Sequence, residues 1–501
     1  MMKTLLPLFV FLGLVLLVMS CQPRVQDKPL RNGIMIDCAR LMEQHDYYHR
    51  LIDFMAEWGM NTLVLHFSDD HGLSIQLPGF EKLAHPRAFT PAEIKQLIAH
   101  ANRRGIEIIP ELEVFGHTRY LTDHPDYEHL YVGQKSGKLV FHAINPLHLE
   151  TTQLMEDLIQ EVVGLFPSKF IHLGCDEVKL NSLYESLDLD EATVWTDYVN
   201  HLIGQVHDLG KTPMIWDDHL VKNQDIAQKL RKDVVLMEWN YEPNYSPDHL
   251  SKLIQMGYED ILMAPSLACY RLRVLPTQPA LDNTRELAVA VEQGLSPGLI
   301  NTIWLPMRYL QNSMWYGIAY SADLINHPGE FDLRAFHKRF AENVFGIPLS
   351  DELHEYLSQW PGLHLDRKAY TAITNNHYDL SDEPEKISEL EGVNQLAQKL
   401  VSQFPQDQPV KNLEILASMQ LSARVVQVIS QGLLIMHDPT GDAAIESQWQ
   451  AELERVIAAV DAEWDQGRYA DDPQKFTAKF SNLESSYLLV VLKKLAQAGA
   501  S

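Results

Sequence analysis

An adjacent pair of acidic residues follows a short apolar run near the middle of the chain. Asp176 and Glu177 follow residues 170–174, a run typical of a buried strand, with only Cys175 in between. Burial raises the pKa of a carboxyl group, and a second carboxylate nearby raises one pKa of such a pair further. A carboxyl group that stays protonated near neutral pH can act as a general acid. We therefore expect Asp176 and Glu177 to be catalytic; the alternative is a solvated pair at a strand end.

Other apolar runs in the first two thirds of the chain also end in residues that can do chemistry. Carboxylates, imidazoles and aromatic rings recur at these positions. These strand-end residues are Asp37 and Arg40; His66, Asp69, Asp70 and His71; Glu111, Glu113 and His117; His172; Trp216, Asp217 and Asp218; Glu238, Trp239 and Tyr241; Tyr270; and Trp304.

Three tryptophans, Trp216, Trp239 and Trp304, end three of these runs. A single tryptophan at such a position is more often a core residue. Three at one rim, together with carboxylates, suit a sugar ring, whose C–H faces stack on aromatic rings while its hydroxyls reach polar side chains. The combination predicts a pocket of the size of a sugar.

The elements that must carry these residues alternate with few breaks. Short apolar runs typical of buried parallel strands are followed by stretches of helical period. The predicted strands are 33–36, 62–66, 106–110, 170–173, 213–216, 234–237, 260–263 and 299–304, and the predicted helices are 47–58, 91–104, 149–165, 195–209, 224–230, 247–256, 284–293 and 310–324. Thr90, Pro91 and Glu93 predict a helix start, with threonine as the N-cap.

Eight strand–helix units over about 300 residues favour a closed (β/α)8 barrel over an open doubly wound sheet. The first strand is not followed by G-x-G-x-x-G, which weighs further against a dinucleotide-binding fold. A barrel places its active site at the carboxyl ends of its strands, where the residues above stand. We therefore expect an α/β fold with a catalytic barrel over residues 31–330.

The strand signal ends after about residue 331. Five segments with helical periodicity follow, at 331–344, 387–404, 413–436, 443–465 and 473–498. They predict a C-terminal all-helical domain over residues 331–501. We find no catalytic constellation in this part of the sequence, which favours a packing or shape-setting module.

The composition excludes several classes of protein. Hydrophobic residues make up 46% of the 501 residues and charged residues 22%, an ordinary globular balance. Lys and Arg number 41 against 67 Asp and Glu, a formal net charge of −26. This charge repels phosphate backbones and anionic lipid head groups, so nucleic acid is excluded as an expected partner.

The N-terminus has the features of a targeting segment. Residues 1–20 contain one lysine and an apolar run that is too short for a comfortable membrane span. Cys21 follows at once, in a context that resembles the lipobox of bacterial lipoproteins. We expect 1–20 to be a lipoprotein signal peptide and 21–30 a tether lipidated at Cys21. Because Gln22 replaces the aspartate of inner-membrane retention, the resemblance implies a lipid-anchored protein of the bacterial cell envelope, facing the periplasm or the surface.

The other cysteines, Cys38, Cys175 and Cys269, have no metal-type spacing and are odd in number. We expect each to pack as a small buried hydrophobic residue. A metal site is nevertheless a rival interpretation of the barrel, because its polar residues suit a divalent ion. The residues of that rival site are His66, Asp69, His71, His117 and Asp176. The absence of His-x-His at the end of the first strand weighs against it.

Residues 172–178, H-L-G-C-D-E-V, resemble the H-x-G-x-D-E motif of family 20 glycoside hydrolases, the β-N-acetylhexosaminidases. The resemblance extends in the expected order over residues 31–325, about 60% of the chain. It includes N-G-I-M-I-D-C-A-R at 32–40, H-F-S-D-D-H-G at 66–72 and P-E-L-E-V-F-G-H at 110–117. The cysteine in the motif and W-D-D at 216–218 are most similar to the hexosaminidase D-like branch.

The resemblance implies substrate-assisted retention, in which the 2-acetamido oxygen of the sugar attacks its own anomeric carbon. Glu177 would protonate the leaving oxygen and then activate water, while Asp176 would accept the acetamide N–H. Tyr270 would donate to the acetamide oxygen. The other substrate-binding residues implied are Asp37, Arg40, Asp70, His117, Trp216, Asp218, Trp239 and Trp304. A metal or organic cofactor is not implied.

Two departures from the family pattern concern the sugar hydroxyls. Asn32 stands where many members have an arginine before the first-strand glycine, and Arg31 lies one position earlier. Pro306 stands in place of the glutamate of the W-x-E segment, and Arg308 is a candidate substitute.

The expected function is that of an exo-β-N-acetylhexosaminidase acting on terminal β-linked GlcNAc, GalNAc or both. The alternatives are a non-catalytic glycan-binding surface lipoprotein and, with less support, the metal-dependent barrel hydrolase. The expected partner is a glycan that ends in an N-acetylhexosamine, with membrane contact only through the lipid on Cys21.

Overall fold

The structure is a computed structural model of the chain. It describes residues 28–132, 143–180, 183, 187–269, 274–329, 331–376, 378, 380, 383–403, 411–438, 442–468 and 487–499. The predicted signal peptide, Cys21 and Tyr270 lie outside these residues.

Eight parallel strands form a closed barrel, because β1 pairs both with β2 and with the last strand, β14. This confirms the predicted fold class. In order round the barrel the strands are β1 (Arg31–Asp37), β2 (Thr62–His66), β6 (Glu107–Glu111), β9 (Phe170–His172), β10 (Thr212–Trp216), β11 (Val235–Trp239), β12 (Ile261–Ala264) and β14 (Gly298–Ile303), with the short β13 (Ser266–Ala268) pairing beside β14.

Side chains along the barrel strands alternate between two hydrophobic layers. Met35 and Val64 belong to a cluster inside the barrel, whereas their neighbours Ile34 and Leu63 belong to the larger cluster that includes the surrounding helices. This alternation follows from the two-residue period of a strand. Because the strands are parallel, their last residues lie at the same rim of the barrel. In six strands these residues are Asp37, His66, Glu111, His172, Trp216 and Trp239.

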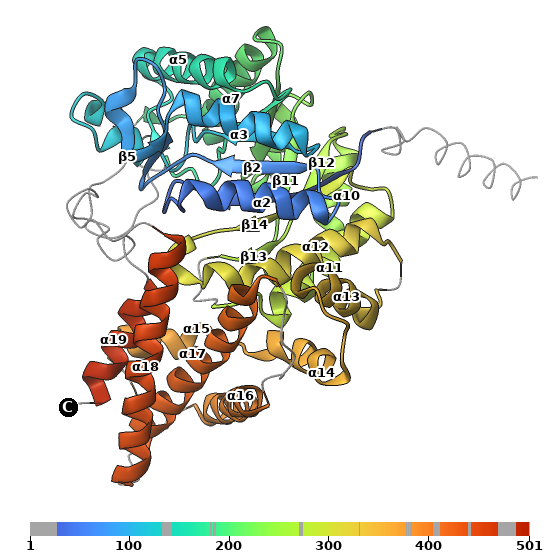
Figure 1. The fold of residues 1–501 in the computed structure, drawn as a ribbon. Coiled ribbons are helices and arrows are strands. Elements are labelled where there is room, and N and C mark those ends of the chain that lie inside the picture. The colour runs from blue at the N-terminus through green and yellow to red at the C-terminus, as the bar shows by residue number, and fades with distance from the viewer. Residues whose placement is uncertain are drawn as a thin grey trace, which may run out of the picture.

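Helices surround the barrel in the predicted order (Figure 1). They are α2 (His45–Glu57), α3 (Pro91–Arg103), α4 (Arg119–Thr122), α5 (Leu149–Leu165), α7 (Glu191–Asp208), α8 (Asp218–Lys222), α9 (Gln224–Lys229), α10 (Asp248–Gln255), α11 (Gln278–Glu292) and α12 (Met314–Asn326). The predicted start of α3 is confirmed: Thr90 Oγ1 accepts from Glu93 N at 3.2 Å, and the Glu93 carboxylate accepts from Thr90 N at 2.8 Å. Cys38, Cys175 and Cys269 are buried, as expected.

Two accessory sheets lie in the strand–helix connections and were not predicted. One contains β3 (Ser68–Asp69), β4 (Gly72–Ile75) and β5 (Ala84–Phe89); the other pairs β7 (Tyr131–Val132) with β8 (Ala143–Ile144). The first follows β2 directly and fixes Asp69 at the rim.

A helical domain follows the barrel and packs against one side of it, drawn in orange and red in Figure 1. Its helices are α13 (Leu333–Phe340), α14 (Asp351–Gln359), α15 (Arg367–Thr374), α16 (Pro384–Ser402), α17 (Leu413–His437), α18 (Ala443–Gly467) and α19 (Tyr487–Gly499). Among the described helices, α17 alone is long and apolar enough to span a membrane, with a mean hydropathy of 1.2, but 61% of that apolar stretch is buried. Because α16, α18 and α19 pack against it, α17 forms the core of this domain.

Candidate active site

The acidic pair lies on a tight turn at the end of β9. Gly174, Cys175 and Glu177 all have positive φ, of 65°, 73° and 49°. Such a conformation is costly for residues other than glycine and persists only where the surroundings hold it. Two hydrogen bonds do so: Glu177 N donates to Asp218 Oδ2 at 3.2 Å, and Val178 N donates to His219 Nε2 at 2.9 Å.

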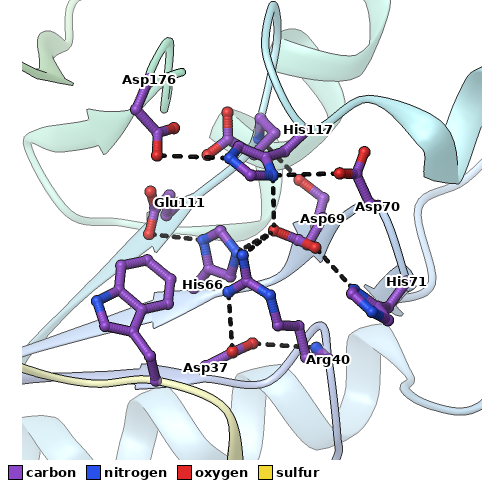
Figure 2. A network of polar contacts seen from close by, with 12 residues as sticks. Asp37, Arg40, His66, Asp69, Asp70, His71, Glu111, His117 and Asp176 are labelled. Atoms are coloured by element: carbon purple, nitrogen blue, oxygen red, sulfur yellow. Dashed lines mark hydrogen bonds and ion pairs between the residues drawn. The ribbon is translucent and has the colours of Figure 1, made fainter. Parts of the chain in front are cut away.

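His117 lies between this turn and the loop that follows β2. Its Nε2 is 3.6 Å from Asp176 Oδ2 and 3.5 Å from Glu177 Oε2. Its Nδ1 is 3.4 Å from Asp69 Oδ2 and 3.3 Å from Asp70 Oδ2, as Figure 2 shows. Although burial opposes the imidazolium, the charges of Asp176 and Asp69 raise the pKa of His117 well above its ordinary value. A buried positive charge is thus shared by two pairs of carboxylates.

The two carboxyls of the pair differ in the direction of their pKa shifts. Burial raises the pKa of Asp176 to about 6, and the charges of Asp218 and Glu177 also raise it. The Glu177 side chain is 32% exposed. Burial opposes its charge, but the hydrogen bond and charge of His117 lower its pKa. The sequence predicts one raised pKa in the pair; the structure places that shift on Asp176 and the opposite shift on Glu177, because Glu177 is the more exposed and faces His117.

Arg40 joins the β1 loop to the β2 loop at the rim. Its Nη1 lies 3.0 Å from Asp37 Oδ2 and its Nη2 lies 2.7 Å from Asp69 Oδ2 (Figure 2). Asp37 is fully buried, and its Oδ2 also accepts from Leu305 N at 3.1 Å. The guanidinium carbon of Arg40 is 5.1 Å from the centre of the Trp304 ring. Asp37 therefore holds Arg40 in place beside the Trp304 ring.

Glu111 holds a second group of buried residues beneath the rim. Its carboxylate lies 2.9 Å from His66 Nδ1 and 3.3 Å from His172 Nδ1, and it accepts from Trp216 Nε1 at 2.8 Å. Burial opposes the imidazolium of His66, but the charge of Glu111 raises its pKa to about 10. Glu111 thus fixes the orientation of Trp216, a role that its position at a strand end alone did not indicate.

The predicted tryptophans form an aromatic wall with Tyr241. The ring centres of Trp216 and Trp304 are 5.9 Å apart, and those of Trp239 and Tyr241 are 5.0 Å apart. Trp304 Nε1 donates to Tyr241 Oη at 2.9 Å, which joins the two halves of the wall. Tyr241 is among the predicted strand-end residues but not among the predicted substrate-binding residues; its place two residues after the end of β11 is the signal that indicates it.

Two further predicted residues support the site from its edges. Asp70 Oδ1 accepts from Arg119 N at 3.2 Å, so this carboxylate bridges α4 and His117. Asp218 Oδ2 accepts from Lys222 Nζ at 2.7 Å as well as from Glu177 N. Both aspartates therefore hold the backbone or side chain of a neighbour in the site. Tyr270 is not among the described residues.

Asp217 and Glu238, at the same rim, belong to a separate cluster. Asp217 Oδ2 lies 2.8 Å from His249 Nε2, and Glu238 Oε1 accepts from Tyr245 Oη at 2.5 Å. Burial raises the pKa of Glu238 to about 7. Asp217 Oδ1 also accepts from Trp239 N at 3.3 Å, which ties this cluster to the aromatic wall.

The residues of the rival metal site form ion pairs with one another. Both ring nitrogens of His66 and of His117 face carboxylates, and the pKa of each imidazole is raised. A histidine binds a metal in its neutral form, through a nitrogen lone pair. A metal ion at His66 or His117 would therefore have to displace a proton that the neighbouring carboxylates stabilise.

The two departures from the family pattern lie at different places in the barrel. The Asn32 side chain points away from the site, because its Nδ2 donates to Ala322 O at 3.3 Å on α12. Arg31 pairs with Glu107 at 3.0 Å, at the start of β6. Position 32 lies at the amino end of β1, and its effect on sugar hydroxyls stays a prediction. Pro306 lies in a buried 3₁₀ turn after β14, and the role of Arg308 stays a prediction.

Comparisons with known proteins agree with this geometry. Residues 31–286, about half of the chain, match the family model "Glycosyl hydrolase family 20, catalytic domain". A β-hexosaminidase of Vibrio furnissii is 26% identical over 329 residues, which are 54% of this chain and 52% of that protein. The chain thus spans about half the length of this relative.

Solved structures of low sequence identity share the fold. The GH20 exo-β-N-acetylglucosaminidase of Vibrio harveyi has a TM-score of 0.50 and 21% identity, and the match covers 62% of this chain and 56% of that one. A β-N-acetylhexosaminidase from Bacteroides fragilis also has a TM-score of 0.50, with 18% identity over 63% and 70% of the two chains. The motif at the end of β9, the closed barrel and the family match agree: the chain belongs to glycosyl hydrolase family 20.

Proposed function

We propose that the protein is an exo-β-N-acetylhexosaminidase that removes terminal β-linked GlcNAc or GalNAc by substrate-assisted, retaining catalysis. The observation that carries the proposal is that His117 Nε2 faces both Asp176 and Glu177, at a barrel rim that also carries the aromatic wall. The arrangement offers an acceptor for an acetamide, a proton donor for a leaving group and rings for a sugar face.

Asp176 is the proposed acceptor for the acetamide N–H. Its Oδ1 atom is buried and has no hydrogen-bond partner among the described residues. An unpaired buried carboxylate oxygen is costly, and an amide N–H would satisfy it. The negative charge of Asp176 would also stabilise the positive charge that develops on the acetamide nitrogen.

Glu177 is the proposed general acid and base, because it is the more exposed carboxyl of the pair. A bound sugar removes water from around it, and this desolvation raises the pKa of a carboxyl group. In the first step the acetamide oxygen forms a bond to the anomeric carbon. The bond to the glycosidic oxygen breaks, and that oxygen takes the proton of Glu177. In the second step the Glu177 carboxylate removes a proton from water, which attacks the anomeric carbon and opens the oxazolinium ring.

The remaining predicted residues are proposed to bind the sugar or to position those that do. Trp216, Trp239 and Trp304 would enclose the acetamide and the ring, with Tyr241 as part of the wall. Arg40 would face the ring hydroxyls, held by Asp37, while Asp70 and Asp218 would position His117 and Glu177. Tyr270 is proposed from the family resemblance as the donor to the acetamide oxygen.

This assignment is tested by measuring how the activity of two variants, Asp176→Asn and Glu177→Gln, depends on the leaving group of the substrate. We expect Asp176→Asn to lose activity toward all chromogenic β-GlcNAc substrates. Glu177→Gln should lose most activity toward substrates with poor leaving groups, and less where the leaving group needs no proton. Equal losses in Glu177→Gln for good and poor leaving groups would contradict the role of Glu177 as the acid. Sugar binding without turnover in the parent protein would favour a glycan-binding lipoprotein.

We also propose that the protein is a lipid-anchored protein of the bacterial cell envelope. The support is the apolar run of residues 1–20 followed by Cys21. Replacement of Cys21 by Ala should abolish the incorporation of a labelled fatty acid and release the protein from the membrane fraction. Labelling that persists in this variant would contradict lipidation at Cys21.

A further inference from the structure

A buried arginine at the end of α18 contacts the rim of the barrel. Arg468 is 3% exposed, and its Nε and Nη2 lie 2.8 Å and 3.0 Å from the two carboxylate oxygens of Glu43. Its Nη1 donates to Tyr309 O at 3.1 Å. Its guanidinium lies over the rings of Trp464, at 4.5 Å, and Tyr309, at 5.3 Å. Two-pronged contacts of this kind fix the geometry of both partners.

Three segments meet at this point. Glu43 lies in the loop after β1 and is fully buried, and its Oε2 also accepts from Gln311 Nε2 at 2.8 Å. Gln311 lies in the connection after β14. The backbone of Glu43 forms a bridge with that of Arg468, and Gln44 Nε2 donates to Arg468 O at 2.8 Å. The end of α18 therefore holds together the loops that follow the first and the last barrel strands.

Each of these loops carries a residue of the candidate active site. Arg40 precedes Glu43 by three positions, and Trp304 precedes Tyr309 by five. Leu41, Met307 and Trp464 form one hydrophobic cluster, and Leu305 packs against it. The helical domain thus contacts the outer side of the same loops whose inner side presents Arg40 and Trp304.

The backbone beside Trp304 depends on these contacts. Leu305 has a φ of 59°, a left-handed conformation that is unfavourable for a leucine. Its N–H donates to Asp37 Oδ2, which also binds Arg40, and its side chain packs against the cluster with Trp464. Strained backbone persists where its surroundings over-determine it. Here the surroundings are Asp37 on the inner side and α18 on the outer side.

We propose that Arg468 is a positioning residue for sugar binding, so that the C-terminal helical domain completes the ring-binding side of the active site. It acts through Glu43 and Tyr309 on the placement of Arg40 and Trp304. The backbone of the turn with Asp176 and Glu177 is held by Asp218 and His219, and Arg40 reaches this turn indirectly, through Asp69 and His117. The effect of Arg468 is therefore expected in sugar affinity and less in the chemical step. This inference rests on the proposed function only where it is tested by KM and kcat, because these values require the hydrolase activity.

The test compares variants of the full-length protein purified in a mild detergent. Arg468→Met removes the positive charge. Arg468→Lys keeps the charge but cannot contact both carboxylate oxygens of Glu43 as the guanidinium does. The double variant, Arg468→Met with Glu43→Gln, leaves no unpaired buried carboxylate at this position. Arg339→Met is the matched control, because Arg339 makes the same two-pronged contact, at 2.7 and 2.6 Å, with buried Asp323 on α12. Asp323 lies one helical turn from Asn326, near the amino end of β1 and away from the rim.

We expect KM for a chromogenic β-GlcNAc substrate to rise at least tenfold in Arg468→Met and in the double variant, with kcat within threefold of the parent. Arg468→Lys should lie in between. Arg339→Met should lower the unfolding midpoint but leave KM within twofold. A folded double variant with KM within twofold of the parent, or an equal rise in Arg339→Met, would overturn the proposal.

A second readout separates this inference from the proposed function. Hydrogen exchange should become faster at residues 38–44 and 304–311 in the Arg468 variants, and tryptophan fluorescence should report weaker binding of N-acetylglucosamine. A parent protein that binds the sugar without hydrolysing it would refute the hydrolase function but leave this comparison valid. Unchanged exchange in both loops would overturn the positioning role whether or not the protein is an enzyme.

Discussion

Gly174 is in direct contact with the carboxyl group of Glu113. A Cβ atom on Gly174 would lie 2.0 Å from Glu113 Oε2, and the same oxygen accepts from Cys175 N at 3.3 Å. Burial and the charge of Asp176 raise the pKa of Glu113 well above its ordinary value, which favours the neutral carboxyl beneath the turn. The shape of the catalytic turn thus depends on a glycine that leaves room for a buried acid.

Gly174→Ala should therefore displace the turn that carries Asp176 and Glu177. The left-handed conformation costs a residue with a Cβ about 1–2 kcal/mol, and the contact with Glu113 adds to this cost. Misplacement of catalytic groups by about 1 Å lowers rates on the order of 100-fold. Gly210→Ala is the control, since Gly210 has a φ of 73° but nothing within 4 Å of an added Cβ. Assays of kcat/KM should show a large loss in Gly174→Ala only; similar losses in both would refute the contact as the cause.

His117 lowers the pKa values of Asp176 and Glu177, so the effect of its removal on these pKa values has a predictable sign. In His117→Gln the positive charge is lost, so the pKa values of Asp176 and Glu177 both rise. Both limbs of the pH profile of kcat/KM should then move to higher pH, and the maximal value should fall on the order of 100-fold. A profile that stays in place or moves to lower pH would contradict the ion-pair geometry.

Tyr241→Phe should weaken sugar binding. The variant removes the acceptor of Trp304 Nε1 and leaves a buried N–H unpaired, which costs about 1–3 kcal/mol. We expect about tenfold weaker binding of N-acetylglucosamine, measured by tryptophan fluorescence. The control is Tyr258→Phe, which removes a buried hydroxyl that donates to Ala227 O at 3.0 Å on the outer side of the barrel. Equal effects of the two variants would indicate a general loss of stability.

The charge of His66 should make the fold sensitive to alkali. The pKa of His66 rises from 6.5 to about 10 in the folded protein. Because the folded state holds this proton more tightly, its stabilisation is complete below pH 6.5 and is lost as the pH rises through about 10. The urea midpoint should fall across this range, and the fall should be smaller in His66→Gln. A midpoint that is constant to pH 10 in the parent would contradict a protonated His66.

Much of the barrel could be predicted because its signals are local. Apolar runs gave the eight strands to within a few residues: the last was predicted at 299–304 and is Gly298–Ile303. The rule that strand ends share one rim brought Asp37, Glu111 and Trp216 together. By contrast, the predictions missed α14 and α15. Leu353, Tyr356 and Leu357 do recur at helical spacing in α14, but each helix has only eight or nine residues, and helices this short depend on tertiary packing for their stability.

The contacts that decide protonation could not be predicted in the same way. His117 has a φ of 47° in a loop, and no periodicity fixes where such a side chain points. Because His117 lies beside Glu177, the pKa of Glu177 is lowered and not raised. Glu43 and Arg468 are 425 residues apart, and each looks like an ordinary surface charge in the sequence.

The central claim is that the acetamide of the substrate takes part in the reaction. The most direct measurement is kcat/KM of the purified protein for chromogenic β-GlcNAc, β-GalNAc and β-glucose substrates with the same leaving group. We predict hydrolysis of one or both N-acetylated sugars and, at most, a trace for β-glucose, which has no acetamide to attack the anomeric carbon. Comparable values for β-glucose and β-GlcNAc would contradict the substrate-assisted mechanism.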